Sequence, residues 1–471
     1  MRGTHRGRGH LLFVACALSA GLLAETGPAA EAAPRYCPGA PGAGDPYFPE
    51  MGNGGYDVGH YDIRLTFSPE TKAIAATTTI FATATQDLTR FDLDFQGPLT
   101  ISRLSVNGRD AAFTRSGAQE LVITPPHGLR EGGAFVVSVT YAGVPQEIDD
   151  PALGRSGWVA TQDGAVALNQ PIGAATYYPV NDTPDDKATY SQTVTVPAGL
   201  TVLANGEPGP TTTRDHQSTF RWSENRPMAS ELSLLAIGHY DLTRSVTPGG
   251  LADISAIGRA IDTDPGQGQV FNQTTAQVVQ WESSMYGPYP FDSTGGILAD
   301  LGVGYALETQ GRPVYDQSTS EVDGELLAHE LGHQWFGDSL TPERWSDIWL
   351  NEGFATYSEW LYQEKFHHIP VQQSFAKAYA DEKDWSGEVA DPGRDHIFDD
   401  LVYNRGAMAL QALRVKIGDR AFFALLEQWP AAHRYGTVST RQFIRFVERL
   451  TGRDLDSFFR TWLYQPGQPA L

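Results

Sequence analysis

Two histidines four residues apart are the strongest chemical signal in the sequence. His329 and His333 belong to the run His-Glu-Leu-Gly-His. On a helix, residues at i and i+4 lie on one face, where both imidazoles can bind one metal ion. Glu330 projects to one side of this pair, where a carboxylate can take a proton from water activated by the ion. The same spacing also arises by chance, so the motif alone leaves a pair of structural histidines as an alternative.

A third ligand is expected, because catalytic zinc sites combine three protein ligands with one open position. Glu352 follows His333 after the 18 residues 334–351. Asn351 can cap a helix here, and that helix can fold back to present Glu352 to the imidazoles. Two alternatives remain open. Glu359, about two turns further on, can be the ligand instead. Glu352 can also be an acid that only stabilises the first turn of its helix.

Together, the runs HELGHQWFGD and WLNEGFATY resemble the zinc signature of the gluzincin aminopeptidases, the aminopeptidase N family. In that signature, His-Glu-x-x-His is followed after 18 residues by Glu, as it is here. The resemblance implies one Zn²⁺ per chain, held by His329, His333 and Glu352, with Glu330 as the general base.

A second segment, the run GYALE at residues 304–308, resembles the strand that pairs with the substrate backbone in this family. The resemblance implies substrate contacts at Gly304, Tyr305 and Ala306, and binding of the free α-amine by Glu308. An edge strand suits this role, since it offers N–H and C=O groups to an extended peptide. The segment departs from the family pattern at Tyr305, which leaves the shape of the side-chain pocket open.

Two more residues acquire roles through the same resemblance. Tyr403, in the run VYNRGA, matches a tyrosine that donates a hydrogen bond to the oxyanion formed during hydrolysis. Gln170 begins the run QPIGAATYYPVNDTP, which resembles a loop of the N-terminal domain that supplies Gln or Glu to the amine pocket. Without the resemblance, Tyr403 is simply one of 19 tyrosines and Gln170 an ordinary turn residue.

Composition limits the class of protein. The 471 residues are 41% hydrophobic and 19% charged, which predicts a folded chain of two or three domains rather than a disordered one. The net charge of -22 argues against a nucleic-acid partner, because phosphate binding requires clustered Lys and Arg.

The N-terminus has the three-part pattern of a secretory signal peptide over residues 1–32. Basic residues at the start precede an apolar run over 11–24, and Ala30-Glu31-Ala32 matches a cleavage site. We therefore expect a secreted, extracellular protein with no membrane association after cleavage. Of the 2 cysteines only Cys37 would remain, so no internal disulfide is expected.

Beyond the signal peptide, the texture of the sequence changes twice. Residues 33–55 are rich in Pro, Gly and Ala and predict a flexible leader. Residues 56–245 alternate apolar and polar positions, which predicts a β domain, whereas 246–471 have mainly helical spacing. The expected fold class is multidomain α+β: an N-terminal antiparallel β-sandwich or saddle, then a mainly helical, thermolysin-like zinc peptidase domain. We expect strands over residues 61–67, 77–85, 121–124, 135–141 and 190–196, and helices over 267–286, 321–336, 351–366, 405–417 and 440–450.

The prediction that follows is a secreted zinc aminopeptidase whose partners are peptides with a free N-terminus. The resemblance spans roughly residues 50–471. It does not extend to the large helical C-terminal domain of longer members, so a more open cleft is expected. Two alternatives stay open: a secreted zinc endopeptidase or other zinc hydrolase on the same scaffold, and a catalytically inactive binding module. The sequence predicts no oligomeric state.

Overall fold

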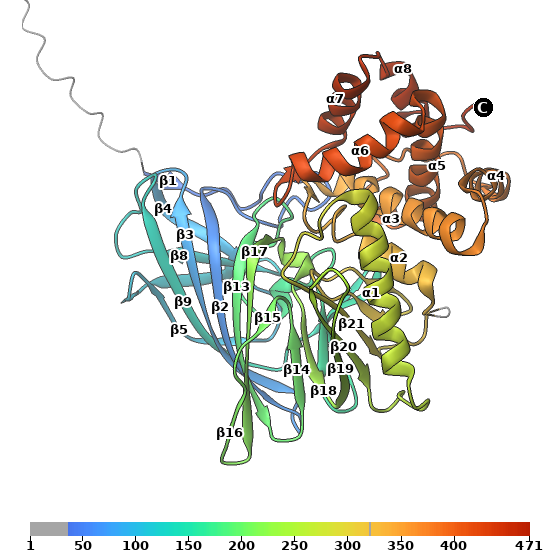
Figure 1. Ribbon diagram of the computed structural model, residues 1–471. Helices are drawn as coiled ribbons and strands as arrows, with labels where there is room; N and C mark the ends of the chain where they lie inside the picture. The colour runs from blue at the N-terminus through green and yellow to red at the C-terminus, as the bar shows by residue number, and fades with distance from the viewer. Residues whose placement is uncertain (1–35, 320–321) are drawn as a thin grey trace, which may run out of the picture. The chain divides into compact units, whose positions relative to one another are not determined.

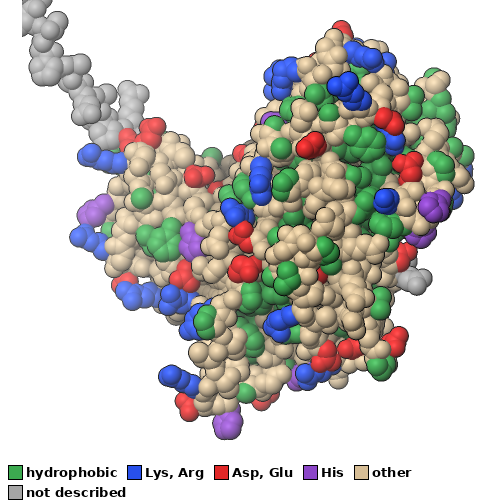
Figure 2. Space-filling model, in the orientation of Figure 1, with side chains coloured by type: hydrophobic (Ala, Val, Ile, Leu, Met, Phe, Trp, Pro, Cys, Tyr) green, Lys and Arg blue, Asp and Glu red, His purple; other side chains and the backbone are tan. Residues whose placement is uncertain are grey.

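The computed structural model describes residues 36–319 and 322–471, and Tyr36–Leu471 form one compact unit (Figure 1). The predicted signal peptide, residues 1–32, lies outside the described residues. None of the helices in the described ranges is long and apolar enough to span a bilayer. On the face drawn in Figure 2, acidic and basic side chains are scattered rather than gathered into patches.

The first half of the chain is built from strands whose residues alternate between core and solvent. In β2 (Tyr56–Ser68), Tyr61, Ile63, Leu65 and Phe67 are all buried, because successive side chains of a strand point to opposite faces. The other strands of this half are β1 (Cys37–Pro38), β3 (Ala73–Ala84), β4 (Leu88–Asp94), β5 (Thr100–Val106), β6 (Arg109–Asp110), β7 (Ala112–Ser116), β8 (Glu120–Thr124), β9 (Ala134–Gly143), β10 (Glu147–Asp150), β11 (Gly154–Ala160), β12 (Ala165–Leu168), β13 (Ala188–Pro197), β14 (Thr201–Ala204), β15 (Glu207–Pro208), β16 (Thr212–Arg214), β17 (Gln217–Met228) and β18 (Leu235–Gly238).

Within the described residues these strands form three sheets. The largest runs β15-β17-β13-β2-β3-β9-β5-β6, with β16 beside β17, and the others run β10-β11-β12-β18-β14 and β1-β4-β8-β7. Most pairs are antiparallel, but β13 lies parallel to β2, with Tyr190 opposite Tyr61. The two aromatic rings stack with centroids 5.0 Å apart. The predicted fold class, a β-rich domain followed by a helical one, is confirmed.

The expectation of a flexible leader differs from the structure over residues 36–55. Phe48 and Met51 are buried in the same hydrophobic cluster as the helices of the second half, and the Phe48 ring lies 5.8 Å from that of Trp345. Asp45 accepts a hydrogen bond from the Trp345 backbone N–H at 2.8 Å. The Pro/Gly-rich composition predicts flexibility and gives no sign that a few side chains, Asp45, Phe48 and Met51, attach this irregular segment to the second half of the chain.

The second half contains a five-stranded sheet that the sequence did not predict. Its order in the described chain is β19 (Tyr240–Val246), β20 (Ala252–Gly258), β21 (Ser293–Ala299), β23 (Val314–Asp316) and β22 (Ala306–Leu307), so β22 is an edge strand. In β20 and β21 nearly every residue is buried, so the period-two alternation that identifies half-exposed strands is missing. The predicted domain boundary at 245/246 falls inside β19, which pairs with β20.

Helices cover this sheet and form the rest of the second half (Figure 1). The short strands β24 (Thr341–Pro342) and β25 (Thr437–Val438) pair with each other. The helices are α1 (Gln267–Tyr286), α2 (Gly324–Gly332), α3 (Trp349–Tyr362), α4 (Val371–Asp381), α5 (Asp400–Ile417), α6 (Asp419–Ala432), α7 (Thr440–Thr451) and α8 (Asp456–Phe459).

Helices α2 and α3 have ends other than those predicted. Asp323 caps α2 by accepting hydrogen bonds from the N–H groups of the first turn, and the helix ends at Gly332 rather than at residue 336. The prediction that Asn351 caps α3 is wrong. A 3₁₀ turn over Trp345–Asp347 leads directly into the helix, so α3 already begins at Trp349 and the Asn351 N–H bonds to Ile348 O.

Helices α3 and α5 cross unusually closely because a glycine faces a glycine. A Cβ placed on Gly406 would lie 2.8 Å from the Gly353 Cα, a distance that no side chain tolerates. Gly353 follows Glu352, and Gly406 lies about one turn after Tyr403. The close crossing therefore brings the helix that carries Glu352 against the helix that carries Tyr403.

Candidate metal centre and substrate-binding site

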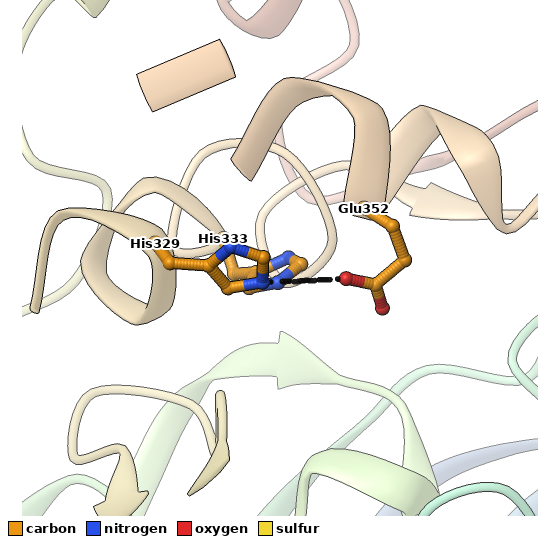
Figure 3. A group of neighbouring side chains, drawn as sticks. All are labelled: His329, His333 and Glu352. Atoms are coloured by element: carbon orange, nitrogen blue, oxygen red, sulfur yellow. Dashed lines mark ion pairs between the residues drawn. The ribbon is translucent and has the colours of Figure 1, made fainter. Parts of the chain in front are cut away.

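Three side chains from two helices converge on one point. The Glu352 Oε2 atom of α3 lies 3.4 Å from Nε2 of His329 and 3.4 Å from Nε2 of His333, both from the α2 region (Figure 3). One nitrogen or oxygen atom from each of the three residues lies within 4.8 Å of the others, and all three side chains are buried. The structure thus brings together the three residues that the sequence motif named as metal ligands.

The remaining ring nitrogens are already bonded to the protein. His329 Nδ1 lies 2.6 Å from Glu359 Oε1, and His333 Nδ1 lies 3.2 Å from Phe336 O. Assigning the ring protons to Nδ1 satisfies both contacts and leaves both Nε2 lone pairs facing Glu352, the arrangement of metal-ligating histidines. Glu359, the alternative ligand, therefore lies on the far side of the His329 ring and orients it.

Glu330 lies beside this triad without joining it. Its side chain is buried, and its Oε2 atom has no hydrogen-bond partner among the described residues. Burial raises the pKa of Glu330 above its ordinary value, and the neighbouring His329 and His333 oppose that rise. A buried carboxylate oxygen without a partner is what a base for a small polar molecule requires.

The donor set fits a divalent transition metal. Two imidazole nitrogens and one carboxylate oxygen are the ligands of many catalytic zinc sites. Burial would raise the pKa of Glu352, but His333 and His329 outweigh burial and lower it, so Glu352 is ionised. Glu308 and Glu330 each place an oxygen within 4.8 Å of a His333 nitrogen. Carboxyl groups thus outnumber imidazoles in this buried cluster, and a bound dication would offset negative charge there.

Glu308 and Gln170 form a pair next to the triad, although 138 residues separate them in the chain. Gln170 Nε2 donates to Glu308 Oε1 at 2.8 Å, and both side chains are buried. Gln334, directly after the zinc-type motif, donates to Glu308 O at 3.2 Å and accepts from the Gly311 N–H at 2.7 Å. These bonds hold Glu308 in place relative to helix α2.

The segment before Glu308 is held by a carboxylate that the sequence analysis missed. Asp316 accepts backbone N–H bonds from four successive residues, including Gly304 at 2.8 Å. Burial tends to raise the pKa of Asp316, but these hydrogen bonds lower it below its ordinary value. Ala306 lies in the edge strand β22, and the Tyr305 hydroxyl donates to Arg155 O at 2.7 Å. No local motif marks Asp316, since most of its partners are backbone N–H groups; the Ser318 hydroxyl also donates to it.

Tyr403 comes to the site from helix α5. Its ring stacks on that of His329 with centroids 6.0 Å apart and an interplanar angle of 18°. Burial raises the pKa of Tyr403, and the carboxylates of Glu352, Glu308 and Glu330 raise it further. The phenol therefore stays protonated and remains a hydrogen-bond donor. Seven of the ten residues singled out from the sequence meet at this site, and Gly304, Tyr305 and Ala306 lie in the segment that leads to Glu308.

A β-rich domain is joined here to a helical domain, in which one helix supplies the His-Glu-x-x-His motif and the next supplies the third ligand, a Glu. This combination defines a metallopeptidase whose metal ligands come from two helices. Residues 58–232 match the Peptidase M1 N-terminal domain, and residues 313–462 match the Peptidase family M1 domain.

Solved structures extend this match along the chain. The chain is similar to an M1 zinc metallopeptidase from Deinococcus radiodurans, with 31% identity, a TM-score of 0.82, and coverage of 91% of this chain and 99% of that one. A mutant of the Deinococcus radiodurans metallopeptidase with a bound Tyr-Ser-Ala substrate has 30% identity, a TM-score of 0.82 and the same coverage. The chain belongs to the M1 family of metallopeptidases.

Curated relatives are longer than this chain. It is 26% identical to aminopeptidase N of Streptomyces lividans over 61% of this chain and 36% of that protein. It is also 26% identical to aminopeptidase N of Lactobacillus delbrueckii subsp. lactis over 88% of this chain and 51% of that protein. The chain thus spans between about a third and a half of these relatives.

Proposed function

We propose that the protein is a zinc-dependent aminopeptidase that removes N-terminal residues from peptides. The single observation that carries the proposal is the position of Glu308. Its carboxylate belongs to one cluster with Glu330 and His333, in which the three ligand atoms lie within 4.8 Å of one another. A fixed anion so close to the base and the metal ligands can bind an ammonium group only one residue away from the bond that is cut.

Zn²⁺ would be held by His329, His333 and Glu352, and when bound it polarises a carbonyl group and lowers the pKa of water. The other roles follow from this chain's own side chains. Glu308 and Gln170 bind the protonated amine of the substrate through charge and hydrogen bonds. Glu330 accepts a proton at Oε2, its unpartnered oxygen, and returns it to the leaving amine.

Two further groups position the substrate. The Tyr403 hydroxyl donates a hydrogen bond to the substrate carbonyl oxygen as negative charge develops on that oxygen. The edge strand β22 offers backbone groups to an extended peptide, and the four bonds to Asp316 fix the approach to that strand before substrate arrives. This prepared geometry supports extended peptides as substrates.

The same proposal places the protein outside the cell, supported by the signal-peptide pattern of residues 1–32. The test of activity uses peptide pairs that differ only in N-acetylation, with and without a chelator. We expect cleavage of the free peptides alone, one residue at a time, and loss of activity in chelator that added Zn²⁺ restores. Cleavage of acetylated peptides at internal bonds would instead identify an endopeptidase.

A further inference from the structure

The loop that follows helix α2 determines how His333 is oriented. His333 is the C-terminal cap of the helix, and after it the chain turns sharply through residues 336–341. Phe336 O lies 3.2 Å from the His333 Nδ1 atom, and the Asp338 N–H donates to His333 O at 2.9 Å. A loop that bonds both to the ring and to the backbone of one histidine controls the direction of its other ring nitrogen.

Gly337 shows how tightly this loop encloses the ring. Its φ of +142° is accessible to glycine but strained for other residues, and a Cβ there would lie 3.2 Å from His333 Nδ1 and 3.2 Å from Asn351 Nδ2. The loop therefore has no room to shift toward the imidazole. The Gly337 N–H donates to Leu340 O at 2.8 Å, so residues 338–341 are bonded to the part of the loop that contacts the ring.

A single lysine from the first half of the chain, Lys187, bonds to residues 338–341 of this loop. Lys187 Nζ donates to Asp338 O at 2.7 Å, to Ser339 O at 3.1 Å and to Thr341 Oγ1 at 2.8 Å. Thr341 Oγ1 passes its own hydrogen to Gly337 O at 2.7 Å. All three hydrogens of one ammonium group are thus used on this loop.

Burial and neighbouring carboxyl groups act in opposite directions on the charge of Lys187. Burial lowers its pKa to about 8, and the carboxyl groups of Glu231 and Asp338 oppose that shift. Glu231 and Asp338 are themselves buried. An ammonium group bonded to carbonyl oxygens makes stronger hydrogen bonds than a neutral donor would.

We propose that Lys187 is a positioning residue of the metal site: it fixes the loop 336–341 so that Phe336 O holds the His333 imidazole toward the metal. Lys187 lies within the matched N-terminal domain, 151 residues before Asp338. Metal affinity in the second half of the chain therefore depends on a side chain of the first half. This inference rests on the metal binding proposed above.

The test measures Zn²⁺ affinity of the full chain by competition with a chromophoric chelator, and records the visible spectrum after Co²⁺ replaces Zn²⁺. Lys187→Met keeps the length of the side chain but removes its donors. We expect about tenfold weaker Zn²⁺ binding, within the range for loss of a partner behind a ligand, and an altered Co²⁺ spectrum. Lys187→Arg, which keeps the charge and the donors, should recover part of both.

Lys72→Met is the matched control, because Lys72 Nζ also donates to two backbone carbonyls, Thr161 O at 2.9 Å and Gln162 O at 3.0 Å. We expect its Zn²⁺ affinity to stay within twofold of wild type. Equal affinity in wild type and Lys187→Met, or equal losses in both methionine variants, would overturn the inference. If Lys187→Met does not fold, Thr341→Val decides: at least threefold weaker binding supports the inference and a change under twofold overturns it. A wild type that binds no Zn²⁺ would instead refute the proposed function.

Discussion

Replacing Glu308 by glutamine separates the charge of the amine pocket from its hydrogen bonding. The glutamine oxygen can still accept the 2.8 Å bond from Gln170, so the change removes a negative charge from a buried position and little else. A hydrogen bond to a charged group contributes about 1.5 to 3 kcal/mol. Since about 1.4 kcal/mol is a factor of ten, kcat/KM for substrates with a free amine should fall about 10- to 100-fold.

We also predict how the fall in kcat/KM divides between kcat and KM. The amine is bound in both the ground state and the transition state, so KM should rise more than kcat falls. The assay is the hydrolysis of aminoacyl nitroanilides, with Zn²⁺ content measured on the same samples. Glu120→Gln, on strand β8, is the control, since it changes a different carboxyl group, whose two buried oxygens have no hydrogen-bond partner within the part of the chain that the structure describes. A fall below threefold, or a parallel loss of Zn²⁺, would refute the assignment of Glu308 to the amine.

Other substitutions test the remaining parts of the structure. Glu330→Gln should lower kcat by about 10²- to 10⁴-fold with Zn²⁺ content unchanged, and a variant that keeps its turnover would remove Glu330 as the base. Tyr403→Phe should lower kcat by about 10²- to 10³-fold with little change in KM, because its hydrogen bond forms with charge that appears during reaction. Gly406→Ala should destabilise the fold by about 1 to 3 kcal/mol, measured by denaturant unfolding, since its Cβ would lie 2.8 Å from the Gly353 Cα. Burial raises the pKa of Asp186 to about 7, so the folded state keeps a proton that the unfolded state releases near pH 4, and stability is lost as the pH rises toward 7. The stability of Asp186→Asn minus that of wild type should therefore increase from pH 5 to pH 8. An equal difference in thermal unfolding midpoint at pH 5 and at pH 8 would contradict this.

Among the strands, period-two alternation predicted some that are half-exposed, such as β9, and gave no signal for those that are buried on both faces, such as β20. Strand β9 was predicted over 135–141 because its residues alternate between core and solvent, and the structure has it at Ala134–Gly143. Strand β20 is buried along almost its whole length, so no alternation marks it. Helix α2 was predicted too long because nothing in residues 333–336, His-Gln-Trp-Phe, marks a helix end, and the bonds of the turn that follows depend on the tertiary fold.

For the site as well, some residues could be predicted from the sequence and others required the structure. The positions of His329, Glu330 and His333 were predicted because local spacing on one helix determines them, whereas Glu352 was assigned through the family resemblance, with Glu359 as an alternative on the same helix. The position of Glu359 behind His329, 2.6 Å from Nδ1, required the structure. Asp316 and Lys187 act on backbone N–H and C=O groups, which every residue carries. No residue-type pattern can identify such partners.

The anchoring of Phe48 and Met51 in the core of the helical half limits where the polypeptide can be trimmed. Removal of the chain through Met51 would empty the apolar sites of Phe48 and Met51 and take away the Asp45 acceptor of the Trp345 N–H. Truncation from the N-terminal side that reaches Phe48 and Met51 is therefore expected to destabilise the packing of the helical half.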